Sequence, residues 1–109
     1  VLGVDAHGVV GRSGPGGRCA EATHVLLVDD HPIVHEGVET LVSRDPNLRM
    51  CSRAHSAHEG AVIAACEPCD VVLLDLHLPD ASAPQAAMAI RAARPGVKVI
   101  LFTGDARRS

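Results

Sequence analysis

The stretch that decides the fold is Val71-Val72-Leu73-Leu74-Asp75-Leu76-His77-Leu78-Pro79-Asp80. Four apolar residues, two of them β-branched, run directly into an aspartate, and a proline follows four residues later. A short apolar run that ends in a turn signal is typical of a buried strand in a parallel sheet. Asp75 is therefore expected at the carboxyl end of a strand, which is the edge where open α/β sheets place their binding sites.

A second stretch has the same form, because the apolar run of residues 25–28 leads into Asp29 and Asp30. If the two strands are neighbours, the carboxylates of Asp29, Asp30 and Asp75 meet at one edge of the sheet. Crowded carboxylates repel each other unless a cation lies among them. Hard oxygen ligands that leave room for water and a phosphoryl group suit Mg²⁺. The sequence therefore predicts a magnesium site at this edge.

The composition limits the class of protein. A chain of 109 residues is long enough for one domain, and 47% hydrophobic with 21% charged residues is the balance of a soluble globular protein. The net charge of −3 and the single aromatic residue, Phe102, argue against a general nucleic-acid binder. No apolar run has membrane-spanning length and the N-terminus lacks a signal-peptide plan, so a cytoplasmic location with reduced cysteines is expected.

Strand and helix patterns alternate after a Gly-rich segment, residues 1–23, which we expect to be a disordered leader. The expected domain covers residues 24–109. Its predicted strands are 24–29, 48–53, 70–74 and 97–102, and its predicted helices are 32–44, 57–66 (opened by a capping box at 56–59) and 83–94. This β-α-β-α-β-α-β order predicts a parallel, doubly wound α/β sheet in a three-layer αβα sandwich. The fourth strand has nothing after it to cover its apolar edge, so we expect aggregation or molten behaviour.

Several side chains receive packing roles from the pattern alone. The inner face of the first helix is predicted to be Ile33, Val34, Val38, Leu41 and Val42, and Met88 and Ile90 are expected to pack in the third helix. Cys66 and Cys69 are expected to be small buried thiols rather than a redox or zinc pair with His55 and His58, because Cys66 ends a helix instead of opening one. Near the predicted acidic site, three histidines are expected to be solvated loop residues, although they could tune it electrostatically: His31, His35 and His77.

Four motifs together point to a family. They are the Asp29-Asp30 pair after an apolar strand, Asp75 after Val-Val-Leu-Leu, Pro79 four residues on, and Thr103 after Val-Ile-Leu-Phe. With these motifs, residues 24–105 resemble the receiver domain of bacterial two-component response regulators. The segment from Asp29 to Gly37, Asp-Asp-His-Pro-Ile-Val-His-Glu-Gly, is similar more narrowly to the NarL/FixJ (LuxR-type) subfamily.

The resemblance implies a flavodoxin-like receiver fold and a role for each motif residue. Asp75 would be the phosphoacceptor, with Asp29 and Asp30 as the acidic pair for Mg²⁺. The backbone carbonyl of His77 would be a further metal ligand, and Thr103 would be the switch hydroxyl.

The resemblance also implies partners. A sensor histidine kinase would be the phosphodonor, and the domain would be a switch that controls transcription rather than an enzyme. The domain could form a homodimer. DNA would be contacted only through a C-terminal helix-turn-helix domain that this chain lacks, and no membrane would be involved.

The sequence also departs from the family pattern. The family's lysine follows a fifth strand, and this chain ends before that strand and the last helix, so we expect a C-terminally truncated domain. Ala83 stands where the family normally has glycine. One alternative is therefore a degenerate receiver that acts as a phosphorylation-independent interaction module. Another is an aspartate-nucleophile phosphohydrolase of the haloacid dehalogenase type, although that family has a second aspartate where His77 stands.

Overall fold

β1 (Thr23–Val28) and β3 (Val71–Asp75) are the central strands of a four-stranded parallel sheet. The computed structural model describes residues 22–103, so most of the predicted leader lies outside the described residues. The order of the strands is β2-β1-β3-β4, where β2 is Leu48–Ala54 and β4 is Lys98–Phe102. The helices between them are α2 (Pro32–Ser43), α3 (Ala57–Cys66) and α4 (Ala83–Ala93). Every predicted element is confirmed, with its ends within one residue of the predicted ends.

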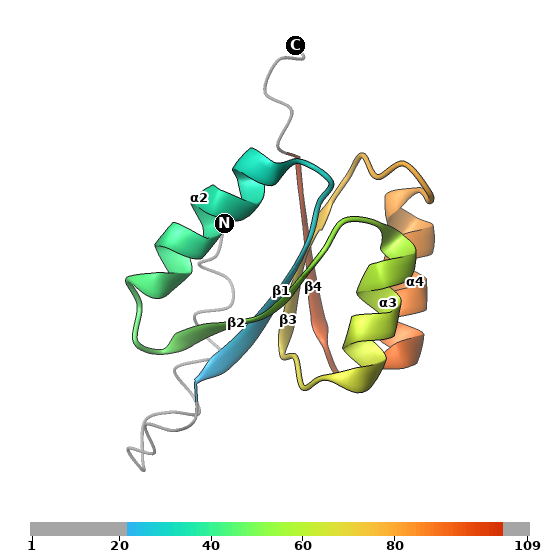
Figure 1. Cartoon of the computed structure of the whole chain (residues 1–109). Helices are drawn as coiled ribbons and strands as arrows, with labels where there is room; N and C mark the ends of the chain where they lie inside the picture. The colour runs from blue at the N-terminus through green and yellow to red at the C-terminus, as the bar shows by residue number, and fades with distance from the viewer. Residues whose placement is uncertain (1–21, 104–109) are drawn as a thin grey trace.

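Both faces of the sheet are covered (Figure 1). Helix α2 lies against one face, and α3 and α4 lie side by side against the other. The central strands are accordingly apolar on both faces, and their most enclosed side chains are fully buried: Leu26, Leu27, Val28, Val72 and Leu74. The predicted three-layer, doubly wound arrangement is confirmed.

Helix α3 approaches β1 closely because Gly60 has no side chain. A Cβ atom at Gly60 would lie 2.9 Å from Cγ2 of Val28, which is closer than two carbon atoms can pack. The helix begins with the predicted capping residue, since the Ser56 side chain accepts a hydrogen bond from the Glu59 N–H. Gly60 therefore fixes how closely the α3 layer lies on the sheet.

Part of the predicted inner face of α2 is wrong. Ile33 is 74% exposed and Leu41 is 60% exposed, whereas His35 and Val42 are buried. At 3.6 residues per turn, Ile33, Gly37 and Leu41 form a stripe that is turned away from the stripe of His35 and Val42. The helix therefore turns a histidine toward the sheet edge and leaves two large apolar residues exposed.

Two other packing predictions also need correction. Met88 is 73% exposed on α4, whereas Ile90 is fully buried as predicted. Cys69 is buried as predicted, but Cys66 is exposed because it is the last residue of α3 and faces solvent. Within residues 22–103, no helix has the length and apolar character that are needed to cross a bilayer.

Candidate metal centre

The candidate site lies where the chain leaves β1 and β3 in opposite directions. These strands are adjacent and parallel, with Val28 paired to Leu74, so Asp29 and Asp75 leave the same edge of the sheet side by side. The chain then continues from β1 to the outer strand β2 and from β3 to the outer strand β4. Such a switch point leaves a crevice that open α/β sheets use for ligands.

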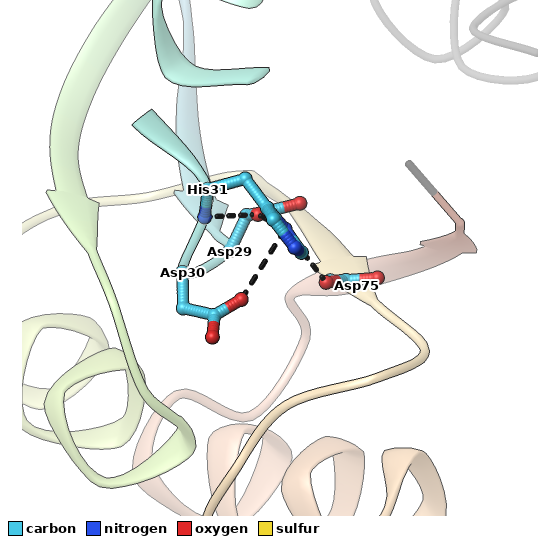
Figure 2. Close-up of side chains that lie close together, drawn as sticks. All are labelled: Asp29, Asp30, His31 and Asp75. Atoms are coloured by element: carbon cyan, nitrogen blue, oxygen red, sulfur yellow. Dashed lines mark hydrogen bonds and ion pairs between the residues drawn. The ribbon is translucent and has the colours of Figure 1, made fainter. Parts of the chain in front are cut away.

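Four side chains meet at this point (Figure 2). Ligand atoms of Asp29, Asp30, His31 and Asp75 all lie within 4.8 Å of one another. In the part of the chain that the structure describes, no other group of three or more histidine, cysteine or acidic side chains comes together in this way. The structure therefore brings together the three predicted carboxylates and adds an imidazole.

Asp29 is held rigidly on three sides. Its N–H donates to the Ala54 carbonyl at 3.0 Å, and its own carbonyl accepts from Nε2 of His35 at 2.6 Å. Its Oδ1 accepts the backbone N–H of His31 at 2.6 Å, which closes a tight turn before α2. His31, not either aspartate, is the N-cap residue of α2, so N-capping of α2 does not explain the acidic pair.

Asp75 is almost completely buried, with 1% of its surface exposed. Its Oδ1 accepts the His77 N–H at 3.2 Å, so it does stabilise the turn that follows β3. Burial, opposed by this hydrogen bond, raises the pKa of Asp75 above its ordinary value, and the nearby Asp29 carboxylate raises it further. The site therefore destabilises the charged form of Asp75 in the absence of a cation.

Two carboxylate oxygens at the site have no hydrogen-bond partner: Oδ2 of Asp29 and Oδ2 of Asp75. Both are buried, and leaving a buried charged oxygen without a hydrogen bond is costly. A divalent cation with oxygen ligands would satisfy both atoms and offset the repulsion between the carboxylates. The residues present therefore fit a magnesium ion, with Asp29, Asp30 and Asp75 as the side chains that would hold it.

His31 is exposed in a loop, as the sequence predicted, with 49% of its side chain accessible, but its ring also contacts the acidic side chains. Its Nδ1 lies 2.7 Å from Oδ1 of Asp29, 3.2 Å from Oδ1 of Asp30 and 3.8 Å from Oδ2 of Asp75. The hydrogen bond with Asp29, and then the charge of Asp29, raise the pKa of His31. The feature of the sequence that could have indicated this contact is the position of His31 between the acidic pair and Pro32, because a following proline holds the His31 backbone in an extended conformation.

His35 is not a solvated histidine, because it is 2% exposed and bonds to the Asp29 carbonyl. Its ring lies against that of His55, with 4.9 Å between ring centroids. The apolar pattern of α2 gave no reason to turn a histidine toward the sheet, so the sequence held no clear signal for this burial. His77, by contrast, is exposed beyond Asp75, as expected.

Thr103 follows the strand that borders Asp75. Asp75 pairs with Phe102 in the β3–β4 ladder, and the Leu76 N–H donates to the Phe102 carbonyl at 2.8 Å. Thr103 is the next residue and is exposed. The sheet therefore places Thr103 at the same edge as the carboxylates.

An open cavity of about 570 Å³ lies beside the carboxylates, lined by Asp30 and the loop of residues 76–82. Asp80 anchors this loop to α3 by accepting the backbone N–H groups of Ala57 at 2.8 Å and His58 at 3.0 Å. These hydrogen bonds lower the pKa of Asp80. At its other end the loop enters α4 through a capping box of Ser82 and Gln85. The loop that lines the cavity is therefore held by hydrogen bonds at both ends, and acidic side chains are among the residues that line the cavity.

The cysteines do not form a second centre among the described residues. Burial, then a hydrogen bond with Glu67, raises the pKa of Cys51 to about 12. Burial also raises the pKa of Cys69. Because a thiolate is the form that binds metals and reacts, these environments argue against a zinc or redox role.

Comparison with known proteins identifies the family of this chain. The family described as "Response regulator receiver domain" matches residues 25–109. This chain belongs to that family. A receiver domain is a regulatory unit, so membership of this family argues against a phosphohydrolase of the haloacid dehalogenase type.

Named relatives narrow the family to the NarL/LuxR type. The receiver domain is 32% identical over 79 residues to the "Nitrate/nitrite response regulator protein homolog" of Haemophilus influenzae, covering 72% of this chain and 38% of the relative. It is 34% identical over 80 residues to the "DNA-binding transcriptional activator DevR/DosR" of Mycobacterium tuberculosis, covering 72% of this chain and 36% of the relative. The chain thus spans well under half the length of these curated relatives.

Solved structures agree with this assignment. A LuxR-family two-component response regulator from Aurantimonas sp. SI85-9A1 matches with a TM-score of 0.67 and 32% identity, over 75% of this chain and 59% of that one. The response regulator domain of Thermotoga maritima CheB, at 19% identity, matches with a TM-score of 0.70 over 81% of this chain and 65% of that one, and supports the fold alone. The flavodoxin-like receiver fold implied by the sequence is confirmed.

Proposed function

We propose that this receiver domain accepts a phosphoryl group on Asp75 from a sensor histidine kinase, in a reaction that depends on Mg²⁺. The observation that carries the proposal is the pair of buried carboxylate oxygens, on Asp29 and Asp75, that lack hydrogen-bond partners beside an open cavity. A buried aspartate whose charge lacks hydrogen bonds is suited to binding a cation. It is also suited to react with a phosphoryl group, because the reaction converts the charged oxygen into part of an acyl phosphate.

The proposed transfer uses Asp75 as the nucleophile. A carboxylate oxygen of Asp75 attacks the phosphorus of a phosphohistidine, the P–N bond breaks, and the departing imidazole takes a proton from solvent. The product is an acyl phosphate on Asp75. Asp29, Asp30 and Asp75 would hold the magnesium ion, together with the backbone carbonyl of His77. A bound magnesium ion would offset the charge that builds up between the carboxylates and the incoming phosphoryl group.

Thr103 is the proposed switch residue. The pairing of Asp75 with Phe102, the residue before Thr103, supports this role. A new hydrogen bond from the Thr103 hydroxyl to a phosphoryl oxygen would couple phosphorylation to a change at the end of β4. The chain itself would act as a switch and have no external product.

The output of the switch is proposed from the relatives. One of them is named a DNA-binding transcriptional activator, and this chain matches about a third of its length. We therefore propose that phosphorylation controls transcription in the cytoplasm, through a helix-turn-helix domain outside these 109 residues and with a homodimer as the DNA-binding form.

The test is the intact mass of the protein after incubation with acetyl phosphate and MgCl₂. We expect one phosphoryl adduct on the wild-type chain, and none on Asp75→Asn or when EDTA replaces Mg²⁺. Asp29→Asn should lose most of the adduct because it removes half of the acidic pair. Asp70→Asn is the matched control, since Asp70 is an exposed aspartate at the opposite end of β3.

A folded wild-type chain that takes up no phosphoryl group would contradict the proposal. That result would favour the alternative function, a phosphorylation-independent interaction module. Circular dichroism of each variant must accompany the mass measurement, so that loss of the adduct is compared only among folded proteins.

A further inference from the structure

The imidazole of His31 is half exposed, yet its Nδ1 lies close to all three carboxylates of the acidic cluster. Figure 2 shows the ring of His31 directed between Asp29, Asp30 and Asp75, with contacts drawn to each of them. A magnesium site needs only oxygen ligands, so the proposed function leaves this nitrogen without a role.

The position of His31 is fixed by its backbone as well as by its ring. Its N–H donates to Oδ1 of Asp29 at 2.6 Å, and Pro32 begins α2 immediately after it. The ring therefore does not have to cross the site to reach a cation, because Nδ1 already lies among the carboxylate oxygens.

The spacing of the atoms suits a shared metal ion. Ligand atoms bound at the usual distances to one first-row ion are about 3 to 4 Å apart. The contacts of Nδ1 with Asp30 and Asp75, at 3.2 and 3.8 Å, fall in this range, and the shorter contact with Asp29, at 2.7 Å, is a hydrogen bond that the ion would replace. One of the two buried oxygens that lack hydrogen bonds, Oδ2 of Asp75, lies 3.8 Å from Nδ1, and the other, Oδ2 of Asp29, belongs to the carboxylate that Nδ1 contacts. These two oxygens are an observation separate from the position of the ring, and they call for a cation.

The mixture of ligands determines which cation is preferred. Magnesium is a hard ion that favours oxygen ligands and retains its water, so an imidazole adds little to its binding. First-row transition ions gain strongly from an imidazole nitrogen. A site of three carboxylates and one histidine is therefore better matched to such an ion than to magnesium.

We propose that His31 Nδ1 is a fourth ligand of this site, and that the site consequently binds a divalent transition-metal ion more tightly than it binds Mg²⁺. The inference deepens the proposed function, because it rests on the assignment of Asp29, Asp30 and Asp75 as the cation site. Binding exchanges the Nδ1–H proton for the metal ion and releases that proton to solvent. Mg²⁺ would instead displace the ring from the cluster and bind to the carboxylates and the backbone carbonyl of His77, without the imidazole.

The test compares two ions on the same set of variants. Isothermal titration of the whole chain with Co²⁺ and, separately, with Mg²⁺ gives both dissociation constants, and the visible spectrum of bound Co²⁺ reports its ligands. The variants are His31→Ala, His31→Asn and the control His24→Ala. The asparagine can keep a hydrogen bond to Asp29 but has no imidazole nitrogen. His24 is a histidine at the other end of β1 that pairs with Asp70.

We expect the wild-type chain to bind Co²⁺ more tightly than Mg²⁺. Both His31 variants should weaken Co²⁺ binding by about tenfold or more, the usual range for changes around a metal ligand, and should alter the Co²⁺ spectrum. Mg²⁺ binding should stay the same or become tighter, because the competing ring is gone. His24→Ala should change neither.

Two results would overturn the inference. If both His31 variants weaken Co²⁺ and Mg²⁺ to the same extent, or leave the Co²⁺ spectrum unchanged, then His31 is not a selective ligand, although the acidic site itself stands. If the folded wild-type chain binds neither ion, the cation site and the inference both fail. Asp75→Asn separates these cases, since it should weaken both ions wherever the carboxylates form the site.

Discussion

At the scale of single residues, the two buried aspartates of the site are held in place by hydrogen bonds, yet each keeps one carboxylate oxygen without a hydrogen-bond partner. Asp29 is fixed by hydrogen bonds through its N–H, its carbonyl and Oδ1, yet its Oδ2 has no hydrogen-bond partner. Asp75 has the same division, with one oxygen bonded to the His77 N–H and the other without a hydrogen bond. Such an arrangement lowers the stability of the metal-free fold and favours binding of a cation and a phosphoryl group.

The Asp75→Asn variant should therefore stabilise the metal-free protein while removing its response to magnesium. Neutralising a buried carboxylate with an unsatisfied oxygen should raise the free energy of unfolding by about 1 kcal/mol or more. Mg²⁺ should raise the wild-type melting temperature and leave that of the variant nearly unchanged. Thermal unfolding with and without Mg²⁺ measures both effects, and a variant less stable than wild type without metal would contradict the account.

The same variant makes a prediction about pH. Burial raises the pKa of Asp75, so the folded state holds the carboxyl proton more tightly than the unfolded chain does. The stability that protonated Asp75 contributes is present at low pH and is lost as the pH rises from the ordinary carboxyl value through the raised folded value. The stability advantage of Asp75→Asn should grow over that interval and level off above it. Denaturant unfolding of both proteins across a pH series measures this difference, and a difference that does not change with pH would contradict the prediction.

At the scale of secondary structure elements, two glycines on helices have opposite roles. Gly60 lies on α3 against Val28, where an added Cβ would meet Cγ2 at 2.9 Å. Gly37 lies on α2 between the exposed Ile33 and Leu41, and an added Cβ would meet nothing within 4 Å. Packing therefore requires a glycine at position 60, where a larger residue would clash, but not at position 37.

Replacing each glycine by alanine should separate these roles. Gly37→Ala should stabilise the protein by about 0.5 to 1 kcal/mol, the gain expected for a glycine in an open helix position. Gly60→Ala should destabilise it by about 1 to 3 kcal/mol, because overpacking outweighs the same gain in helix propensity. Chemical denaturation measures both, and equal effects of the two substitutions would show that α3 does not pack on β1 as described.

The elements were also the most predictable part of the molecule. Continuous apolar runs of residues 25–28 and 71–74 that end in aspartates identified the two central strands and hence the edge where the carboxylates meet. The orientation of side chains on helices was less predictable. The sequence offers five apolar residues as the inner face of α2, and helical periodicity alone does not tell which of them are buried. Contacts with the rest of the fold decide this, and they leave Ile33 and Leu41 exposed.

The residues missed at the site depend on long-range contacts. The ring of His31 lies near Asp75, which is at the end of β3 and 44 residues further along the chain. The buried His35 is held by a hydrogen bond to the Asp29 carbonyl. No local pattern encodes either contact. Sequence alone placed the three carboxylates together but could not assign an orientation to the histidines among them.

At the scale of the whole molecule, the described surface carries separate apolar positions that no described element covers. Ile33 and Leu41 are exposed on α2, and Leu101 is 48% exposed on the edge strand β4. Exposed apolar residues next to an unpaired strand edge favour association between molecules. The aggregation expected from the sequence stays a prediction.

The double variant Ile33→Gln, Leu41→Lys should reduce this association. Both side chains are largely exposed, so polar replacements should leave the cooperative unfolding transition in place while increasing the fraction of monomer. Analytical ultracentrifugation over a range of concentrations measures the change. The buried neighbour Val42 is unsuitable as a site of change because it packs in the core. A wild-type chain that is monomeric throughout would contradict the prediction.

The most direct test of the central claim is to locate the phosphoryl group. After incubation with acetyl phosphate and Mg²⁺, borohydride reduces an aspartyl phosphate to homoserine, which tandem mass spectrometry places in the sequence. The account predicts homoserine at position 75 alone, and none when Mg²⁺ is withheld. Homoserine at position 29 or 30, or a phosphoryl group on a histidine instead of an aspartate, would contradict the assignment of Asp75 as the phosphoacceptor.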